Sequence, residues 1–399
     1  MRRRILVTEG EERSSLAVVR SLGRAGHELI VCSRNGRSLA GASRFASGDR
    51  RVPDPLSEEN AYLEAVLRVS EETGAEAIIP MTDAACTVLL PARARFGDIR
   101  VLGPTAEAYR RISDKAAVAL VAERCGIAVP SRVEMRAPGE AAALPLSEEL
   151  FPAVVKPVRS VSAEAGRRRR VPVQYAEGRE ALESLLVDAP TEAYPLLIQQ
   201  RIDGVGVGVF LLRSRGRTLA AFSHRRLREK PPSGGVSVYR EAATLDPGLL
   251  SACERLLAAY EWEGVAMVEL KLETVSAVPY LMEVNGRFWG SLQLAVDAGV
   301  DFPALFVAAA FGEAVEPVLD YRVGTRCRWW WGEVDHALAV LRMSAEERRR
   351  LGLGARVGAL AHLLRPSTRH DRFEVLRRED PRPFMREAGA WVSALIRRA

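Results

Sequence analysis

Cysteine, lysine and long apolar runs are scarce in this sequence. Aromatic residues make up only 6% of its 399 residues, and five cysteines occur without C-x-x-C spacing, so the pattern indicates neither a zinc site nor a disulfide framework. No stretch approaches the roughly 20 apolar residues of a membrane helix, and the opening MRRRILVTEG turns polar too early for a secretory signal. We therefore expect a cytoplasmic globular protein with no membrane partner, long enough for two or three domains.

Lysine is rare although the chain is basic. Only four of the 57 lysine and arginine residues are lysine, at Lys115, Lys156, Lys230 and Lys271, and the net charge is +6. A basic chain can bind nucleic acid, but the arginines are spread along the whole sequence, which indicates a compositional bias, so no nucleic-acid partner is expected. Each lysine is informative, because an ammonium group and an arginine fork are not interchangeable at a tight phosphate site.

The N-terminal part lacks a dinucleotide fingerprint. Residues 4–7, 16–25 and 28–33 read as strand, helix and strand, and a helix at 58–73 continues the alternation of a doubly wound α/β domain over residues 1–110. The first loop, G-E-E-R-S-S, has one glycine and two acids that would repel a pyrophosphate, whereas a dinucleotide site needs G-x-G-x-x-G. A nicotinamide cofactor is therefore not favoured.

Residues 280–294, YLMEVNGRFWGSLQL, are the most informative stretch. They read as a strand that runs into a loop and a helix, with Glu283, Asn285 and Arg287 at alternate positions. Side chains on a strand alternate faces, so these three point the same way. A carboxylate, an amide oxygen and a guanidinium on one face predict a metal and phosphate site.

A second strand at 264–272, GVAMVELKL, carries Glu269 and is predicted to pair antiparallel with the first. Glu269 and Glu283 would then converge, while Met282 and Val284 point into the core. Two carboxylates and an amide supply hard oxygen ligands, which suit Mg²⁺ held between protein and nucleotide phosphates. The alternative is a half-buried strand with a solvated polar face.

These two strands resemble the metal-binding end of the ATP-grasp ligases, in which an acidic residue on one strand is followed by E-x-N-x-R on the next. The resemblance implies an α/β fold of the α+β ATP-grasp type, with two α+β subdomains that clasp ATP behind a doubly wound pre-ATP-grasp domain. The expected parts are the pre-ATP-grasp domain at 1–110, the small lid subdomain at 111–200, the catalytic subdomain at 201–314 and a C-terminal α/β extension at 315–399.

The same resemblance assigns roles on the strand pair. Glu269, Glu283 and Asn285 are expected to bind two Mg²⁺ ions, for which Mn²⁺ can substitute. Arg287 is expected to stabilise the transferred phosphoryl group and then the tetrahedral oxyanion.

Two lysines match positions at which the family contacts nucleotide phosphates. Lys115 starts a helix that Ser113 and Asp114 can cap. Lys156 lies inside the apolar strand 151–158, FPAVVKPV, where a buried charge needs an anionic partner. Taken alone, Lys115 reads as a solvated helix charge; the resemblance makes both lysines ATP-binding residues.

Two further segments resemble nucleotide contacts. Residues 159–170 match a phosphate-covering loop, and the arginine run at 167–170 is either a solvated hairpin tip or a contact to phosphate or an acidic substrate. Residues 196–204, LLIQQRIDG, resemble the linker whose backbone binds the adenine edge. The linker candidates for ATP are Gln199, Gln200, Arg201, Ile202 and Asp203, the last being the nearby acid for the ribose.

Residues 222–241, FSHRRLREKPPSGGVSVYRE, are polar, and their prolines and glycines predict a long shaped loop. Loops of this length are usually functional. The segment resembles the reaction-centre segment H-R-R-x-R-E and P-x-x-G-G-x-S of uncharacterised ATP-grasp carboxylate-amine ligases, which implies contacts to a carboxylate or an acyl phosphate. The implied contacts are His224, Arg226, Arg228, Gly235 and Ser237. His224 is equally compatible with a satisfied structural residue.

The C-terminal part, 315–399, falls outside the family pattern. R-C-R-W-W-W at 326–331 reads as a strand followed by two helical stretches. The tryptophans at 329–331 either line a substrate pocket or pack against the ligase core. The histidines in this part lack metal-ligand spacing; they are His336, His362 and His370.

The resemblance implies an ATP-dependent ligase that joins a small-molecule carboxylate to an amine through an acyl phosphate and releases ADP and phosphate, with amino acids among the substrates to consider. It implies ATP and Mg²⁺ as cofactors and allows a homodimer. One alternative keeps the fold but activates bicarbonate, as in biotin carboxylases and carbamoyl-phosphate synthetases. Another is a non-catalytic nucleotide-binding or nucleic-acid-binding protein, but converging carboxylates have no use on a purely basic binding surface.

Overall fold

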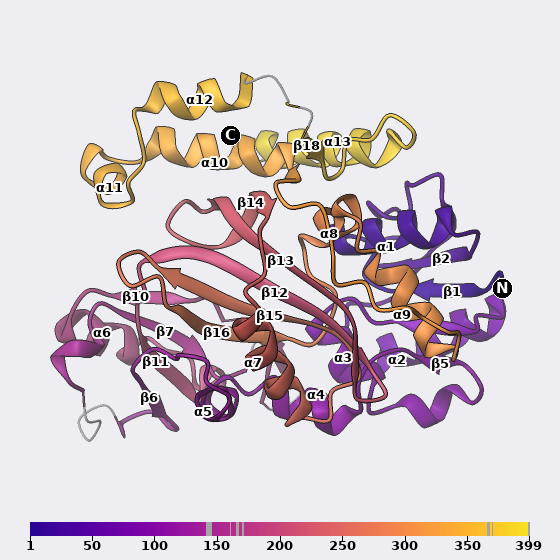
Figure 1. Ribbon diagram of the computed structural model, residues 1–399, viewed down its shortest axis with the longest axis horizontal. Coiled ribbons are helices and arrows are strands. Elements are labelled where there is room, and N and C mark those ends of the chain that lie inside the picture. Colours follow the sequence, from indigo (N-terminus) through magenta and orange to yellow (C-terminus); the bar gives the residue numbers. More distant parts are fainter. Residues whose placement is uncertain are drawn as a thin grey trace.

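The described part of the chain forms three larger sheets, a two-stranded sheet and a C-terminal group of helices (Figure 1). The computed structural model describes the whole chain except residues 141–145, 160, 165, 166, 170, 365–367, 369, 398 and 399. In Figure 1 the indigo N-terminal sheet lies at one end, the long strands of the central sheet cross the middle, and the yellow C-terminal helices form a layer along one side. The mixed α/β architecture predicted from the sequence is confirmed.

The N-terminal sheet is parallel throughout, with strand order β3-β2-β1-β4-β5. Its strands are β1 Arg4–Val7, β2 Glu28–Ser33, β3 Ala46–Arg51, β4 Ala77–Ile79 and β5 Arg100–Val101, and its helices are α1 Arg13–Arg24, α2 Glu59–Thr73, α3 Asp83–Leu89 and α4 Ala106–Ile112. Strand order reverses around β1, and ligands of such sheets bind outside the carboxyl ends of the strands at this point. The predicted doubly wound unit is confirmed.

A small antiparallel sheet, of order β10-β7-β11-β6, follows helix α5. Its elements are α5 Lys115–Arg124, β6 Arg132–Met135, β7 Ala153–Pro157, β10 Gln174–Ala176, α6 Arg179–Val187 and β11 Leu196–Gln200. It has a hydrophobic core of its own, built around Leu182, Leu196 and Ile198. Between β7 and β10, β8 Ser162–Glu164 and β9 Arg167–Arg169 form a separate hairpin; Arg170, at the end of the arginine run, lies outside the described residues.

The central sheet has seven strands in the order β16-β15-β12-β13-β14-β17-β18. It comprises β12 Gly204–Ser214, β13 Arg217–Lys230, β14 Val236–Ala242, β15 Gly264–Glu273, β16 Pro279–Asn285, β17 Arg326–Arg328 and β18 Asp371–Phe373, with helices α7 Pro247–Ala258, α8 Leu292–Ala298 and α9 Phe302–Ala310. The prediction of a long loop at 222–241 is wrong. Most of it is the β13–β14 hairpin, because opposite charges such as Arg225 and Glu241 pair across the two strands and satisfy a polar sequence within a sheet.

The C-terminal part is joined to the other parts of the protein through strands and buried charges. Strands β17 and β18 extend the central sheet, and α10 Trp330–Arg342, α11 Ala345–Arg350, α12 Arg356–Leu364 and α13 Arg382–Ile396 follow around them. Arg20 of α1 pairs with Asp380 at 2.8 Å, and both are fully buried. The prediction of a strand at 326–331 is correct for Arg326–Arg328, whereas helix α10 begins at Trp330. The domain boundaries at 110, 200 and 314 stay predictions.

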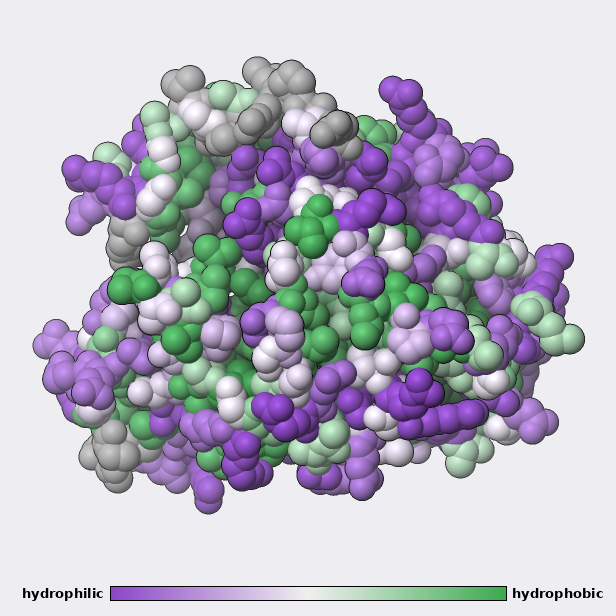
Figure 2. All heavy atoms as spheres, viewed as in Figure 1, coloured by the Kyte–Doolittle hydropathy of each residue, from purple (hydrophilic) through white to green (hydrophobic). Residues whose placement is uncertain are grey.

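Two hydrophobic cores run continuously between the N-terminal sheet and the central sheet, joining Leu6 to Val268 and Val7 to Phe210. Figure 2 shows hydrophilic residues around the periphery of this face and hydrophobic residues gathered across its middle. Within the described ranges, no single helix is long and apolar enough to cross a membrane; α8 and α9 reach that length and hydropathy only as a pair, which is bent by 93°.

Candidate active site

The central sheet aligns the polar residues of interest in one row. Glu283 on β16 is the register partner of Glu269 on β15, which is also the partner of Gly208 on β12, and Gly208 in turn faces His224 on β13. Register partners in antiparallel strands point to the same face of a sheet. The predicted convergence of Glu269 and Glu283 is therefore confirmed, and an imidazole stands in the same row.

Glycines in β12 leave this face open. An added Cβ would lie 2.6 Å from Arg226 Cδ at Gly206 and 2.9 Å from His224 Cδ2 at Gly208. Glycine inside a strand often marks such a close approach. Because β12 has no side chains here, Arg226 can reach across it and pair with Glu269 at 2.6 Å. The alternating G-V-G-V-G of residues 204–208 is the sequence signal from which these positions could have been found.

Both predicted phosphate-binding lysines come to Glu283. Asp114 caps α5 by accepting a hydrogen bond from the Ala117 amide at 3.0 Å, and this fixes Lys115 at the start of the helix. Lys115 Nζ lies 3.6 Å from the Glu283 carboxylate. Lys156, on β7, is only 8% exposed and approaches the same carboxylate from the small sheet. Two ammonium groups and a carboxylate therefore meet where the small and central sheets face each other.

The register of β16 shifts beside Met282, because Glu269 pairs with Glu283 and Leu270 with Leu281. Such a bulge leaves one residue out of the ladder. The carbonyl of Met282 accepts a hydrogen bond from Lys156 Nζ at 3.2 Å. The prediction that Met282 points into the core is wrong, since Leu281 and Val284 take the buried positions.

The charges at this junction perturb one another. Burial lowers the pKa of Lys156 to about 8, although Glu283 acts in the opposite direction. Burial raises the pKa of Glu269, and the nearby Glu283 charge adds to this rise against the opposing effect of Arg226. Burial also acts to raise the pKa of Glu283, but Lys115 and Lys156 outweigh it and hold that pKa below its usual value. Glu283 is therefore an anion at neutral pH in front of two lysines.

Arg287 is held in place by a residue from the N-terminal part. Its guanidinium donates to Asp83 at 2.8 Å and to Asn285 Oδ1 at 3.1 Å, while Asn285 Nδ2 donates to Glu283 at 3.1 Å. Asp83 also accepts a hydrogen bond from Tyr109 at 2.8 Å. Burial disfavours the Arg287 cation, but Asp83 outweighs it and raises the pKa of Arg287. Asp83 and Arg287 are 204 residues apart, so their pairing has no local sequence signal.

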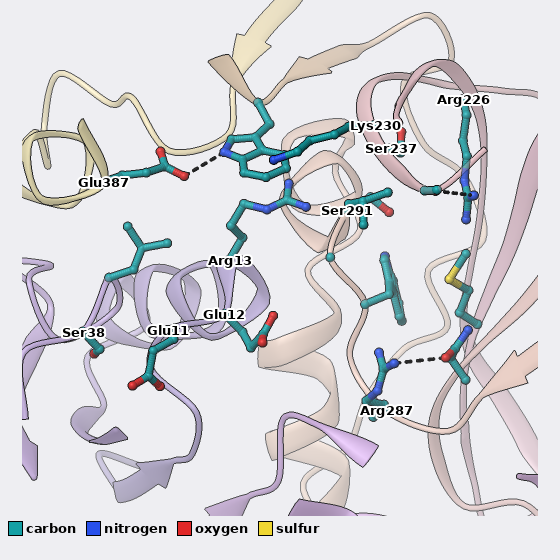
Figure 3. A pocket seen from close by; sticks show the side chains of 18 of the residues that line it. Glu11, Glu12, Arg13, Ser38, Arg226, Lys230, Ser237, Arg287, Ser291 and Glu387 are labelled. Carbon is teal, nitrogen blue, oxygen red and sulfur yellow. Dashed lines mark hydrogen bonds between the residues drawn. The ribbon is translucent and has the colours of Figure 1, made fainter. Parts of the chain in front are cut away.

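Two cavities meet at Glu283 and Asn285, which line both. Cavity A, of about 810 Å³, lies over the polar row and is also lined by residues of α1 and α13 (Figure 3). Cavity B, of about 1050 Å³, lies between the N-terminal part and the small sheet and is lined by Asp83, Lys115 and Arg159. Of the predicted residues, cavity A is lined by His224, Arg226, Gly235, Ser237, Glu269, Glu283, Asn285 and Arg287.

One predicted catalytic residue lies elsewhere. The register of β13 shifts on both sides of Arg228, and its guanidinium pairs with the buried Glu333 of α10. Arg228 lines a separate cavity of about 370 Å³ with His336, beside the α11–α12 connection. Arg228 is not among the residues that line cavity A, and its place at the reaction centre stays a prediction.

The predicted adenine linker joins β11 to β12. Gln199 and Ile202 are buried, whereas Asp203 is exposed. The Gln200 amide donates to the Ser131 carbonyl and the Arg201 amide to the Pro152 carbonyl, and Lys271 Nζ donates to the Ile202 carbonyl at 3.0 Å. These residues are not among those that line cavities A and B, so their contact with ATP stays a prediction.

The donor set fits a magnesium ion that shares its ligands with phosphates. Glu269 and Glu283 stand as register partners, and the Glu283 charge adds to the effect of burial in raising the pKa of Glu269. A divalent cation would relieve this repulsion. Within the described part of the chain no group of three or more histidine, cysteine, aspartate or glutamate side chains could hold a metal ion alone. Mg²⁺ is commonly bound by one or two carboxylates plus substrate phosphates.

The chain is similar to one protein family and to several solved structures. Residues 192–331 match the model of a family described as ATP-grasp in the biosynthetic pathway with Ter operon. No curated protein matches the chain. Among solved structures, L-amino acid ligase from Bacillus licheniformis is 17% identical, with a TM-score of 0.60, over 78% of this chain and 75% of its own.

Two other solved structures are similar to the same extent. Biotin carboxylase from Campylobacter jejuni is 17% identical, with a TM-score of 0.63, over 81% of this chain and 74% of its own. N5-carboxyaminoimidazole synthetase from Staphylococcus aureus is 11% identical, with a TM-score of 0.60, over 81% and 80% of the two chains. At these identities the likeness shows the fold, and it is the ATP-grasp fold of the family model that residues 192–331 match.

Proposed function

We propose that the protein is an ATP-dependent ligase that joins an organic carboxylate to an amine and releases ADP and phosphate. One observation carries the proposal: Glu269 and Glu283 are register partners, Lys115 lies 3.6 Å from Glu283, and the Glu283 charge also acts on the buried Lys156. This is a place where nucleotide phosphates and a divalent cation can share charge. The family match and the named ligases among similar structures support the same reaction class.

In this proposal Lys115 and Lys156 bind the nucleotide phosphates, and Glu269, Glu283 and Asn285 hold Mg²⁺, as two ions for which Mn²⁺ can substitute. When bound, Mg²⁺ neutralises charge on the phosphate oxygens. Phosphoryl transfer asks the protein mainly for positioning and charge stabilisation. Cavity B leads to Glu283 past Lys115, so we assign it to the phosphate side, and the linker at 199–203 to the adenine.

The reaction has two balanced steps. A carboxylate oxygen of the substrate attacks the γ-phosphorus, the bond between that phosphorus and the bridging oxygen breaks, and ADP leaves. The amine nitrogen then attacks the acyl carbon, the bond from that carbon to the phosphate oxygen breaks, and phosphate leaves with the electron pair while the nitrogen loses a proton. We assign to Arg287, which pairs with Asp83 at 2.8 Å, the stabilisation of the transferred phosphoryl group and of the oxyanion.

Cavity A supports an organic acceptor over bicarbonate. Its volume of about 810 Å³ lies in the range of sites that enclose drug-sized ligands, roughly 300–1,000 Å³. A bicarbonate ion would fill a small part of it. Residues from three parts of the chain, such as Glu12, Ser237 and Glu387, line the cavity, which gives an organic substrate contacts along its length.

The test is ADP release from Mg·ATP by the purified protein, with pools of carboxylic acids and pools of amines supplied separately and together, followed by mass spectrometry. We expect ADP only when an acid and an amine are both present, with a product lighter than their sum by one water. ADP formed with bicarbonate alone would favour the alternative function, an enzyme of the same fold that activates bicarbonate. No ADP with any combination, from protein that binds Mg·ATP, would contradict the ligase.

A further inference from the structure

A chain of hydrogen bonds runs from helix α4 of the N-terminal part to the strand pair of the candidate active site. The Tyr109 hydroxyl donates to Asp83 at 2.8 Å, and Asp83 accepts a second hydrogen bond from Arg287 at 2.8 Å. Arg287 donates to Asn285 at 3.1 Å, and Asn285 donates to Glu283 at 3.1 Å. Two residues of the N-terminal part are thereby connected to the proposed metal ligands on β16.

The N-terminal end of this chain is held firmly. Asp83 is the first residue of α3, and Thr82 caps that helix by accepting a hydrogen bond from the Ala85 amide at 3.2 Å. Tyr109 is only 3% exposed. Burial raises the pKa of Tyr109 well above its usual value, and the Asp83 charge adds to this rise. The hydroxyl therefore keeps its proton, and the Asp83 carboxylate is fixed both by its own helix and by a buried tyrosine.

The turn that precedes Arg287 lies beside the same tyrosine. A Cβ at Gly286 would lie 3.3 Å from Tyr109 Cδ2 and 2.4 Å from Trp262 Cη2, and both aromatic side chains are buried. A side chain at this position would have to displace one of the rings, so glycine permits the close approach. Tyr109 thus lies against the turn with its ring and binds Asp83 with its hydroxyl, which sets the position of Asp83 relative to Arg287.

The pair with Asp83 leaves part of the Arg287 guanidinium available to a ligand. Nη2 donates to Asp83 and Asn285, and Nη1 donates to the Phe288 carbonyl at 3.0 Å. Nε is buried and has no hydrogen-bond partner in the described part of the chain, and Arg287 lines cavity A (Figure 3). Since a guanidinium has five N–H donors, Arg287 can keep its pair with Asp83 and still donate to an oxyanion in the cavity.

An Arg287 without this counterion would have other carboxylates within the same cavity. Glu269 and Glu283 also line cavity A, and a flexible arginine side chain that is no longer paired can reorient toward either of them. Stabilisation of a transition state requires donors that are fixed before the reaction begins. Asp83 supplies a counterion that is not a proposed metal ligand, and it fixes the direction of the guanidinium.

Resting on the proposed ligase activity, we propose that Asp83, held by Tyr109, is a positioning residue for Arg287. It fixes the guanidinium toward cavity A for phosphoryl transfer and keeps it from pairing with Glu269 and Glu283. The N-terminal part then contributes to the rate of the reaction without contacting the reacting atoms. Neither Asp83 nor Tyr109 belongs to the E-x-N-x-R pattern, so that pattern alone does not complete the site.

The first test is steady-state kinetics with the acid and the amine that give the fastest ADP release. Asp83→Asn should lower kcat at least tenfold while the KM values for ATP, acid and amine change less than threefold. Asp83→Glu keeps the charge and should retain more activity than Asp83→Asn. Unchanged kcat in folded Asp83→Asn would overturn the inference. A loss confined to one KM would also overturn it, because Asp83 would then bind that substrate directly.

Two controls separate positioning from general destabilisation. Asp297 also pairs with an arginine, Arg377, in a largely buried position, but it lines neither cavity A nor cavity B. Asp297→Asn should therefore leave kcat within twofold of wild type in protein that is folded. Tyr109→Phe should lower kcat about threefold, whereas Tyr62→Phe should not, although the buried Tyr62 hydroxyl also donates to a carboxylate at 2.6 Å. Equal effects within either matched pair would contradict the proposed role.

A test without turnover separates this inference from the proposed function. Phenylglyoxal modifies arginine side chains, and peptide mapping by mass spectrometry gives the rate at each arginine. Arg287 should react at least fivefold faster in Asp83→Asn than in wild type, because its guanidinium is no longer paired, whereas Asp297→Asn should leave the Arg287 rate unchanged. Equal Arg287 rates in wild type and Asp83→Asn would overturn the positioning even if wild type releases ADP. A faster rate, with no ADP from wild type, would support the fixed Arg287 and count against the proposed function.

Discussion

Replacing Lys156 by methionine should stabilise the protein while removing its binding of Mg·ATP. Burial lowers the pKa of Lys156 from its usual 10.5 to about 8, so the folded state holds this proton less tightly than the unfolded state does. The difference corresponds to about 3 kcal/mol of lost stability when both states are protonated. Losing the hydrogen bond to the Met282 carbonyl would cost about 1 kcal/mol. The net gain at pH 7 is therefore about 2 kcal/mol, and Lys115 still faces Glu283.

The pH dependence follows from the sign of the shift. Below pH 8, Lys156 is charged in both the folded and the unfolded state, so burying its charge costs the full amount of stability. Between about pH 8 and 10.5 the folded state loses the proton first, and this loss of stability becomes smaller. Urea unfolding of wild type and Lys156→Met should differ most at pH 7 and converge toward pH 10.5. The control is Lys271→Met, because Lys271 also donates from a strand to a carbonyl, at 3.0 Å. A Lys156→Met protein that is less stable than wild type at pH 7, or a difference independent of pH, would refute the reasoning.

Two further predictions concern packing and buried charge. Gly208→Ala should lower kcat/KM by tenfold or more, because the new Cβ would lie 2.5 Å from Phe210 Cζ and displace the ring that packs against His224 and Trp289 in the wall of cavity A; steady-state kinetics within twofold of wild type would contradict it. Asp380→Asn should destabilise the protein by about 3–5 kcal/mol, since it leaves the fully buried Arg20 without its counterion. Glu379→Gln, at an exposed ion pair, should cost less than about 1 kcal/mol, and equal denaturation midpoints for the two variants would count against this account.

The strand pair could be predicted because its signals are local. Two strands with alternating polar residues and a short connection place Glu269 opposite Glu283, and only one register buries Val284. The position of Lys156 near an anionic group could also be predicted, since an apolar strand rarely carries a lysine without an anion nearby. Asp114 follows the ordinary rule for a helix N-cap, which fixes Lys115.

The other features of the fold and the site could not be predicted, because they depend on contacts between residues far apart in the sequence. Bulges decide where Met282 and Arg228 point, and they arise from the pairing of whole strands. Asp83 meets Arg287 across about half the sequence. The polar hairpin of β13 and β14 looked like a loop, because its charges are satisfied only by cross-strand partners such as Glu241.

The most direct test of the central claim is calorimetric titration of the protein with ATP in the presence and absence of Mg²⁺, for wild type and Glu283→Gln. The account predicts Mg²⁺-dependent binding that weakens at least tenfold in Glu283→Gln, because the carboxylate between the two lysines and the metal is lost. Glu273→Gln is the matched control, since Glu273 ends the same β15 strand but bonds to Ser276 outside both cavities; its affinity should equal that of wild type. Wild-type protein that does not bind Mg·ATP, or Glu283→Gln that binds it as tightly as wild type does, would contradict the account.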